Sequence, residues 1–290
     1  MQLHLLDATF ELFRAYYGAP SRTAPDGQEV GAVYGLILST LPLFEEGGVT
    51  HLGAATDQVI ESFRNQLYPG YKTGEGVPSD LLGQFPIAED ALRAIGVVVW
   101  PMVDFEADDA LATAVTRFMD EVERVVILSP DKDLAQCVIE ERVVTFDRMR
   151  GTLRGREGVI AKFGVAPESI PDYLALVGDS ADGFPGIPGW GAKSAAGVLA
   201  HYLHLEAIPE AASDWQVTVR GAARLAASLQ AERTQALLYR ELATLRRDAP
   251  IPETLTDLEW RGVPRPAFEL LCGELGFEGL LGRPQRWQES

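Results

Sequence analysis

Acidic residues follow four short apolar segments of this chain, and each of these segments is typical of a buried β-strand. The segments are residues 3–6, 50–56, 97–99 and 124–128. The acids that follow them, in the same order, are Asp7; Asp57; Glu106, Asp108 and Asp109; and Asp131 and Asp133. Because aspartate is common in turns, one such acid is uninformative. Four strand ends with the same feature indicate a shared site.

Helical patterns lie between these apolar segments, for example at residues 28–44, at residues 79–95 and from residue 106 to about residue 119. Strands that alternate with helices form a parallel sheet covered on both faces. In such sheets ligands bind beyond the carboxyl ends of the strands. We therefore predict an α/β fold with a mainly parallel central sheet flanked by helices, in which the acids converge on one edge.

The acids at residues 104–109 have two explanations. Helix dipoles favour acids in the first turn, and Asp104 is a candidate N-cap. Three carboxylates within four residues, however, repel one another and indicate a bound cation. Hard divalent ions prefer oxygen ligands, and the chain has only four histidines and two cysteines, with no zinc spacing. The pattern thus predicts a carboxylate metal site.

Composition limits the other possibilities. The net charge of −17 excludes a general basic surface for nucleic acid, so any DNA contact must be local. Cys137 and Cys272 lie among apolar residues and are expected in the core. The N-terminus has no signal-peptide pattern, and no apolar run reaches the roughly 20 residues of a membrane span. A reducing, cytoplasmic location is expected.

The sequence pattern changes near residue 165. Glycines at 186, 189 and 191 precede a helical pattern that starts near Lys193, and Asp179 and Asp182 stand just before them. Accessible backbone N–H groups and a helix N-terminus form a phosphate clamp of the helix–hairpin–helix type. The alternative is a Pro/Gly-rich turn between packed helices. The preceding acid pair and Lys193 favour the clamp.

These patterns predict two domains. A catalytic core is expected at residues 1–164, with a fifth strand at 143–146 paired to residues 152–154. A helical DNA-binding region is expected at residues 165–290, with the hairpin at about 178–202 and a loose tail at 282–290. Arg220 and Arg224 are expected one helical turn apart, either on a duplex backbone or as solvated surface charge. For Trp190, packing inside the hairpin is favoured over a DNA contact.

Taken together, the motifs resemble the 5′-nucleases, which include the bacterial 5′→3′ exonuclease domain of DNA polymerase I and the flap endonucleases. The resemblance spans roughly residues 3–202. It rests on the order and spacing of short motifs: Leu6-Asp7, Thr56-Asp57, Phe63-Arg64 with Tyr71-Lys72, Glu106-Ala107-Asp108-Asp109, Asp131-Lys132-Asp133-Leu134, and Gly178-Asp179 with Asp182.

The resemblance implies roles for individual residues. The matching metal-binding acids are Asp7, Asp57, Glu106, Asp108, Asp109, Asp131, Asp133, Asp179 and Asp182. Lys72 matches a lysine that contacts the scissile phosphate. The hairpin matches a helix–three-turn–helix that grips duplex DNA and commonly holds a K⁺ ion, and its expected DNA contacts are Gly186, Gly189, Gly191, Lys193 and Ser194.

Phosphodiester cleavage fits this assignment. Two Mg²⁺ or Mn²⁺ ions about 4 Å apart activate water, neutralise the phosphorane and stabilise the leaving oxygen. One ion is expected on Asp7, Asp57 and Asp108, and the other on Asp108, Asp131, Asp133 and Asp182. Glu106, Asp109 and Asp179 are expected to act directly or through water. Lys72, Asp108 and Asp131 are the expected catalytic residues.

The expected substrate is DNA with a 5′ flap, a nick or a free 5′ end, and the expected protein is a monomer that serves a polymerase on another chain. Residues 73–95 correspond to the arch that threads single strands in the family. This segment holds four acids against one arginine, and like charge repels a strand. A junction-binding module with weak or no cleavage therefore stays a second hypothesis, and an RNA-cleaving relative a third. Gln58, Glu75 and Gly183 depart from the family pattern.

Overall fold

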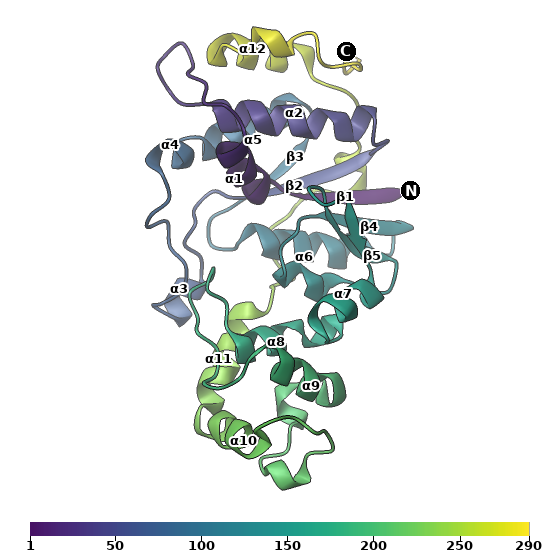
Figure 1. Cartoon of the computed structure of the whole chain (residues 1–290). Helices are drawn as coiled ribbons and strands as arrows, with labels where there is room; N and C mark the ends of the chain where they lie inside the picture. The colour runs from purple at the N-terminus through teal and green to yellow at the C-terminus, as the bar shows by residue number, and fades with distance from the viewer. Residues whose placement is uncertain (290) are drawn as a thin grey trace. The chain divides into compact units, whose positions relative to one another are not determined.

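The computed structural model describes residues 1–289, which divide into two compact units. The first, here called the sheet unit, comprises Met1–Ile60, Gly74–Ser129 and the chain from Arg247. The second, the helical unit, comprises Glu61–Thr73 and Pro130–Arg246. These units distribute the chain differently from the predicted boundary after residue 164, which stays a prediction. Figure 1 shows the helices and strands of both units.

Four parallel strands form the centre of the sheet unit, in the order β3-β2-β1-β4. They are β1 (Gln2–Asp7), β2 (His51–Asp57), β3 (Val98–Met102) and β4 (Arg124–Leu128). Leu6 of β1 is in register with Ala54 on one side and Leu128 on the other. The carboxyl ends of the four strands therefore lie at one edge, as predicted.

Helices cover both faces of these strands. They are α1 (Ala8–Gly18), α2 (Gly31–Glu45), α4 (Ser79–Leu82), α5 (Phe85–Ala94), α6 (Ala107–Phe118) and α12 (Arg265–Leu275), with 3₁₀ turns η5 (Leu255–Leu258) and η6 (Glu278–Leu280). Figure 1 shows α6 on one face and α1, α2 and α5 on the other. Leu111 and Phe118 of α6, in the predicted helical pattern from residue 106 to about 119, are buried. The predicted α/β fold is confirmed.

The arch segment, residues 73–95, contains α4 and α5 and is fastened within the sheet unit. The side-chain oxygen of buried Gln84 accepts from the backbone N–H groups of Ala32 and Val33, at 3.0 and 3.2 Å. It thereby caps α2, which has no capping side chain of its own at Val30. The Tyr16 hydroxyl donates to the carboxylate of Asp80 at 2.9 Å.

The helical unit consists of short helices and one hairpin. Its elements are α3 (Arg64–Leu67), η1 (Asp133–Cys137), β5 (Val143–Asp147), β6 (Thr152–Arg154), α7 (Arg156–Phe163), η2 (Pro167–Ser169), α8 (Ile170–Val177), α9 (Ala192–Tyr202), η3 (Leu205–Ala207), η4 (Ala212–Asp214), α10 (Ala222–Ala231) and α11 (Arg233–Ala243). The hairpin β5–β6 is antiparallel, as predicted.

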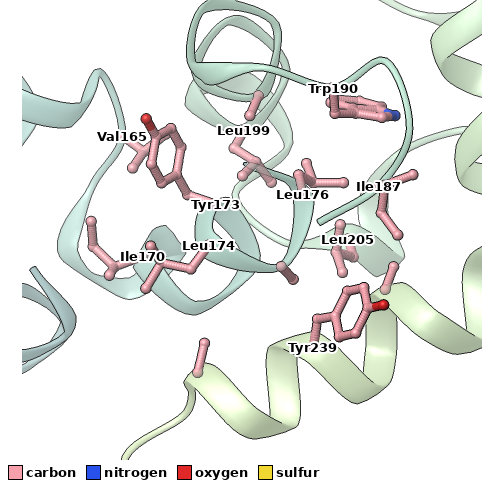
Figure 2. Close-up of a cluster of buried hydrophobic side chains, with 14 of the residues drawn as sticks. Val165, Ile170, Tyr173, Leu174, Leu176, Ile187, Trp190, Leu199, Leu205 and Tyr239 are labelled. Carbon is pink, nitrogen blue, oxygen red and sulfur yellow. The ribbon is translucent and has the colours of Figure 1, made fainter. Parts of the chain in front are cut away.

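One apolar core holds the helical unit together (Figure 2). Leu174 and Leu176 of α8, Leu199 of α9 and Tyr239 of α11 are buried in it. Helix α8 packs on α9, on α11 and on η1, which begins at Asp133, and it leads directly into the turn at residues 178–191. Both η1 and this turn carry predicted site residues.

Three local expectations were wrong. Residues 282–289 are not a loose tail throughout, because the backbone N–H groups of Val263 and Gln288 bond to the carbonyls of Arg286 and Val263, and residue 290 lies outside the described residues. Arg220 is not one helical turn from Arg224 on a helix, since α10 begins after Gly221. The cap of α6 is Glu106 and not Asp104, which is exposed. Within residues 1–289, no helix has the length and apolar character needed to cross a bilayer.

Candidate metal centre and nucleic-acid interface

The sheet edge of the sheet unit brings its predicted acids to the ends of neighbouring strands. Asp7 ends β1, and its carboxylate accepts from the N–H of Phe10 at 2.9 Å and from the Ser129 hydroxyl at 2.8 Å. Asp57 ends β2, and its carboxylate accepts from the N–H of Ala107 at 2.7 Å. Asp57 is thereby joined to the first residue of α6.

The three acids at the start of α6 differ in their surroundings. Asp109 is fully buried, and its carboxylate accepts from the N–H of Glu106 at 3.0 Å in a capping box. Glu106 is the buried N-cap, whereas Asp108 is half-buried. Helix capping therefore explains why Glu106 and Asp109 stand at the start of α6. Asp108 is the most accessible of the three acids.

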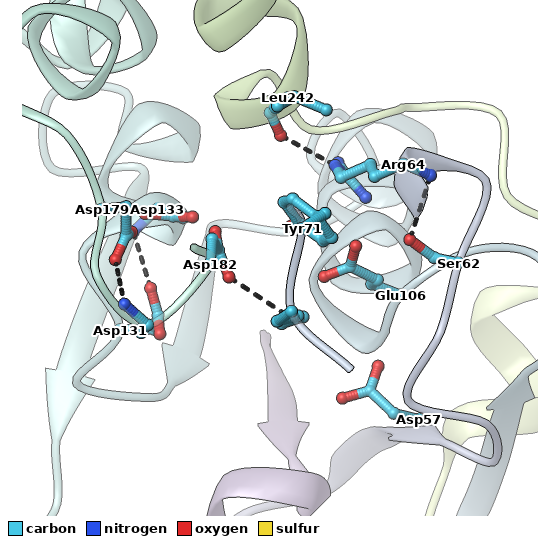
Figure 3. Close-up of polar contacts among 12 residues, drawn as sticks. Asp57, Ser62, Arg64, Tyr71, Glu106, Asp131, Asp133, Asp179, Asp182 and Leu242 are labelled. Atoms are coloured by element: carbon cyan, nitrogen blue, oxygen red, sulfur yellow. Dashed lines mark hydrogen bonds and ion pairs between the residues drawn. The ribbon is translucent and has the colours of Figure 1, made fainter. Parts of the chain in front are cut away.

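A tighter acid cluster lies in the helical unit and consists of Asp133, Asp179 and Asp182, here called the acid cluster. Carboxylate oxygens of these three buried residues lie within 4.8 Å of one another. Figure 3 shows them with Asp131, whose carboxylate accepts from the N–H of Asp133 at 2.8 Å. Asp133 begins η1, and Asp179 and Asp182 belong to the turn after α8.

The acid cluster has the chemistry of a hard-cation site. Among residues 1–289, the buried Oδ1 of Asp133 accepts no hydrogen bond. Burial, followed by the charges of Asp131 and Asp182, raises the pKa of the Asp133 carboxyl well above its usual range. Buried carboxylates that repel one another are costly unless a cation compensates them. The oxygen-only donor set fits Mg²⁺ or Mn²⁺.

Two lysines contact the acid cluster. The ammonium of Lys132 lies 2.5 Å from Asp179 Oδ2 and 3.9 Å from Asp133 Oδ1. Burial lowers the pKa of Lys132, but the neighbouring carboxylates, Asp133 foremost, raise it by more, so the net shift is upward. The ammonium of Lys72 lies 3.4 Å from Asp182 Oδ1.

The chain around Lys72 is positioned by close backbone packing. The N–H of Lys72 donates to the carbonyl of Asp182 at 3.0 Å. Gly183 has a φ of +87°, and a Cβ there would lie 2.2 Å from the carbonyl oxygen of Gly70. Glycine therefore stands at position 183, where the family often has asparagine, because the Gly70–Lys72 backbone approaches too closely for a side chain.

Arg64 has a structural role that the sequence did not reveal. Its side chain is 1 % exposed, and its guanidinium donates to the carbonyl of Leu242 at 2.8 Å (Figure 3). It also donates to the carbonyl of Thr244 at 3.1 Å. These carbonyls lie at the end of α11. Arg64 thus fastens the segment that carries Lys72 to a helix some 180 residues further along the chain.

The glycines of the hairpin serve different purposes. Gly186 has a φ of +74°, and a Cβ there would lie 2.4–2.7 Å from the backbone of Leu176, Val177 and Gly178 at the end of α8. A Cβ at Gly189 would meet only the Arg224 side chain, at 3.8 Å or more, and one at Gly191 would meet nothing within 4 Å. Gly186 is therefore required for packing, while Gly191 leaves open space.

Open space at Gly191 belongs to a groove at the N-terminus of α9. The groove has a volume of about 660 Å³ and is lined by Gly189, Gly191, Ala192, Lys193, Ser194, Gly197, Thr218, Val219 and Arg220. The Ser194 hydroxyl accepts from the N–H of Gly191 at 3.0 Å and donates to its carbonyl at 2.9 Å, which fixes the first turn. Lys193 and Arg220 are exposed on opposite segments of this groove, so cations stand beside a helix N-terminus.

Trp190, by contrast, is a packing residue, as the sequence favoured. It is buried, its indole N–H donates to the carbonyl of Leu225 at 3.2 Å, and its ring lies 6.1 Å from that of Trp215. Cys137 and Cys272 are also buried, as predicted.

Comparisons with known proteins cover both parts of the chain. Residues 2–164 match the family model of the 5′-3′ exonuclease N-terminal resolvase-like domain, and residues 165–266 match that of the 5′-3′ exonuclease C-terminal SAM fold. DNA polymerase I of Mycobacterium tuberculosis is 34% identical over 287 residues, which are 97% of this chain and 31% of that protein. The chain thus spans about a third of the length of its polymerase relatives.

A second relative is similar in length. The 5′-3′ exonuclease of Aquifex aeolicus is 34% identical over 207 residues, 71% of each chain. The fold is shared with a solved structure of the T5 5′-exonuclease with zinc ions bound, at a TM-score of 0.67 and 17% identity over 84% of this chain and 89% of that one. By the matches over both parts of its sequence, this chain belongs to the 5′-3′ exonuclease family.

Proposed function

We propose that this chain is a divalent-metal-dependent nuclease that hydrolyses DNA from 5′ ends and at 5′ flaps, in replication or repair. The observation that carries the proposal is the acid cluster, in which three buried carboxylates meet within 4.8 Å in a member of the 5′-3′ exonuclease family. An acid triad with no histidine or cysteine suits phosphate chemistry supported by Mg²⁺ or Mn²⁺.

Asp133, Asp179 and Asp182 would hold one divalent ion, and Asp7, Asp57, Glu106, Asp108 and Asp109 remain proposed ligands at the sheet edge. Bound divalent ions supply an activated water and neutralise charge on the phosphorane. Asp131 keeps Asp133 in place through the bond to its N–H, so its part in the proposal is to hold the ligand geometry.

Lys72 is the proposed electrophile on the scissile phosphate. Its ammonium is half-buried beside Asp182, and its backbone is bonded to that residue. A fixed ammonium next to the acid cluster can stabilise charge that develops in the transition state without reorganisation. Lys72 would accordingly act on the rate of cleavage more than on affinity for DNA.

The groove at α9 is the proposed duplex contact. The N–H groups at the start of α9, together with Lys193, Ser194 and Arg220, offer donors and positive charge to a phosphate. Gly191 permits close approach because its Cβ position is empty. A K⁺ ion at this hairpin belongs to the same proposal.

The arch segment is less repulsive than its composition suggests. Glu89 is buried and accepts from the Thr56 hydroxyl at 2.9 Å and the Gln58 amide at 3.4 Å. Arg93 forms ion pairs with Glu89 and Asp90. Because burial takes Glu89 away from the surface that a single strand would contact, cleavage is favoured over the junction-binding hypothesis. Gln58, unusual for the family, is thereby a partner of Glu89.

The experiment is cleavage of 5′-labelled flap and nicked DNA in Mg²⁺ or Mn²⁺ over a range of salt. Short products are expected, and Asp131→Ala combined with Asp133→Ala should abolish them while the circular dichroism spectrum is retained. Asp214→Ala, which removes an exposed acid of the same unit, is the matched control. Absence of cleavage with either metal would refute the proposed nuclease activity.

Retained junction binding without cleavage would instead support the junction-binding module, and preference for structured RNA in competition would support an RNA-cleaving relative. The proposal also includes a monomeric state, a cytoplasmic location and action together with a DNA polymerase on another chain. Gel filtration and pull-down with a polymerase lacking its own 5′-nuclease domain test the first and the last of these.

A further inference from the structure

Lys132 is the lysine of the Asp131-Lys132-Asp133 motif, and its side chain turns onto the acid cluster. Its ammonium pairs with Asp179 Oδ2 at 2.5 Å, and Asp133 Oδ1 lies 3.9 Å from it. The Lys132 side chain is 32% exposed, whereas the Asp179 side chain is 2% exposed. A partly exposed cation thus contacts a buried carboxylate.

Charge balance explains why a cation stands there. Three carboxylates within 4.8 Å destabilise one another, and burial weakens the screening by water. An ammonium at Asp179 offsets part of this repulsion. Asp179 is one of the three carboxylates that would bind a divalent ion, so the ammonium and the ion compete for it.

We propose that Lys132 is an internal counter-cation of the acid cluster, which stabilises the metal-free protein and leaves Asp179 when a divalent ion binds. Lys132 thereby weakens metal affinity and keeps the empty site folded. This inference rests on the metal site of the proposed function, but it concerns binding and not cleavage.

The two lysines at the acid cluster are suited to different tasks. Lys72 is held through its backbone N–H and contacts Asp182 at a longer distance of 3.4 Å. Lys132 reaches Asp179 by its flexible stem, which can swing into solvent without moving the backbone. Displacement by an incoming ion is therefore expected at Lys132.

The test is titration of the metal-free protein with Mn²⁺, with free Mn²⁺ measured by electron paramagnetic resonance. Lys132→Met should bind Mn²⁺ at least about tenfold more tightly than the unchanged protein, because a positive charge has left the site. Without metal its melting temperature should fall by several degrees, and saturating Mn²⁺ should restore it. Lys132→Gln, which keeps a polar tip, is the second variant and should show the same tightening.

Two control variants test whether the change in Mn²⁺ affinity comes from the charge of Lys132. The first keeps that charge, and the second removes a positive charge elsewhere in the unit. Lys132→Arg keeps the charge and should bind Mn²⁺ within about threefold of the unchanged protein. Arg156→Met removes a cation of the same unit that pairs with Glu168 at 2.8 Å, and should leave Mn²⁺ affinity unchanged.

Unchanged or weaker Mn²⁺ binding in both Lys132→Met and Lys132→Gln would overturn the inference, since a merely structural ion pair predicts that result. Failure of the unchanged protein to bind Mn²⁺ would overturn it as well, together with the metal site. Tighter binding in a protein that cleaves no DNA would uphold the inference while the proposed nuclease function fails.

Discussion

The N–H of Lys72 donates to the carbonyl of Asp182 at 3.0 Å, and the ammonium of Lys72 lies 3.4 Å from the carboxylate of the same residue. Backbone packing therefore fixes the position of Lys72, the proposed phosphate contact, relative to Asp182, a proposed metal ligand. That packing depends on the approach of Gly70 to Gly183.

Gly183→Ala should disturb this register. The new Cβ would lie 2.2 Å from the carbonyl oxygen of Gly70, and the φ of +87° would strain the backbone by a further ~1–3 kcal/mol. We expect a lower free energy of unfolding in urea and slower DNA cleavage. Gly151→Ala is the control, because its φ of +61° brings the strain but its Cβ meets nothing within 4 Å. Equal losses in the two variants would contradict the packing argument.

Lys72→Met should slow single-turnover cleavage of flap DNA by roughly 10²–10³-fold, the effect of losing a charge-stabilising donor. Affinity for the DNA, measured by fluorescence anisotropy in Ca²⁺, should change much less, since Lys72 is proposed to act on the transition state. Arg156→Met, which removes a cation paired with Glu168 at 2.8 Å, serves as the control for loss of a positive charge in the same unit. A cleavage rate within threefold of the unchanged protein would remove Lys72 from the catalytic residues.

The sheet edge was predictable from the sequence because it depends on local patterns. Alternation of strands and helices fixes the parallel order, and parallel order brings strand ends together. The bond between the Asp57 carboxylate and the N–H of Ala107 is the consequence, across 50 residues. The acid cluster was predicted in part, since its three members were named but Asp179 was not separated from the other acids by any local signal.

Contacts between distant segments were not predictable in the same way. The guanidinium of Arg64 is buried against carbonyls of residues 242 and 244, and Gln84 caps a helix that begins at residue 31. In both cases a polar side chain satisfies backbone groups that no sequence pattern marks. Lys132 is similar, because a lysine between two aspartates reads as solvated charge until its partner Asp179 is located.

Arg64→Met should destabilise the helical unit. The substitution keeps much of the apolar stem but leaves the buried carbonyl of Leu242 without its donor, at a cost of about 1–3 kcal/mol. Water can replace the donor at the exposed Thr244. Urea unfolding followed by tryptophan fluorescence measures the loss. Arg220→Met, at an exposed position, should leave stability unchanged. A decrease of less than about 1 kcal/mol in the free energy of unfolding would show that water replaces the guanidinium as the hydrogen-bond donor to these carbonyls.

The hairpin glycines provide a matched pair. Gly186→Ala should destabilise the protein, because its Cβ would overlap the backbone at the end of α8. Gly191→Ala should cost about 0.5–1 kcal/mol, because glycine is preferred to alanine at the N-cap of α9. It should also weaken duplex binding, since its Cβ would enter the groove. Thermal melting and anisotropy with nicked duplex separate the two effects. Unimpaired duplex binding by Gly191→Ala would exclude close approach of a phosphate at that position.

His4 should make the protein sensitive to mild acid. Burial lowers the pKa of this histidine in β1 from 6.5 to about 4, so between these pH values the unfolded chain binds a proton that the folded protein does not. The stability that His4 contributes is therefore complete above pH 6.5 and is lost as pH falls toward 4, by about 2 kcal/mol at pH 5. His4→Gln should lose less stability than the unchanged protein between pH 7 and pH 5 in urea titrations, whereas His201→Gln, at an exposed position, should follow the unchanged protein. Equal acid sensitivity of His4→Gln and the unchanged protein would mean that His4 is protonated in the folded state.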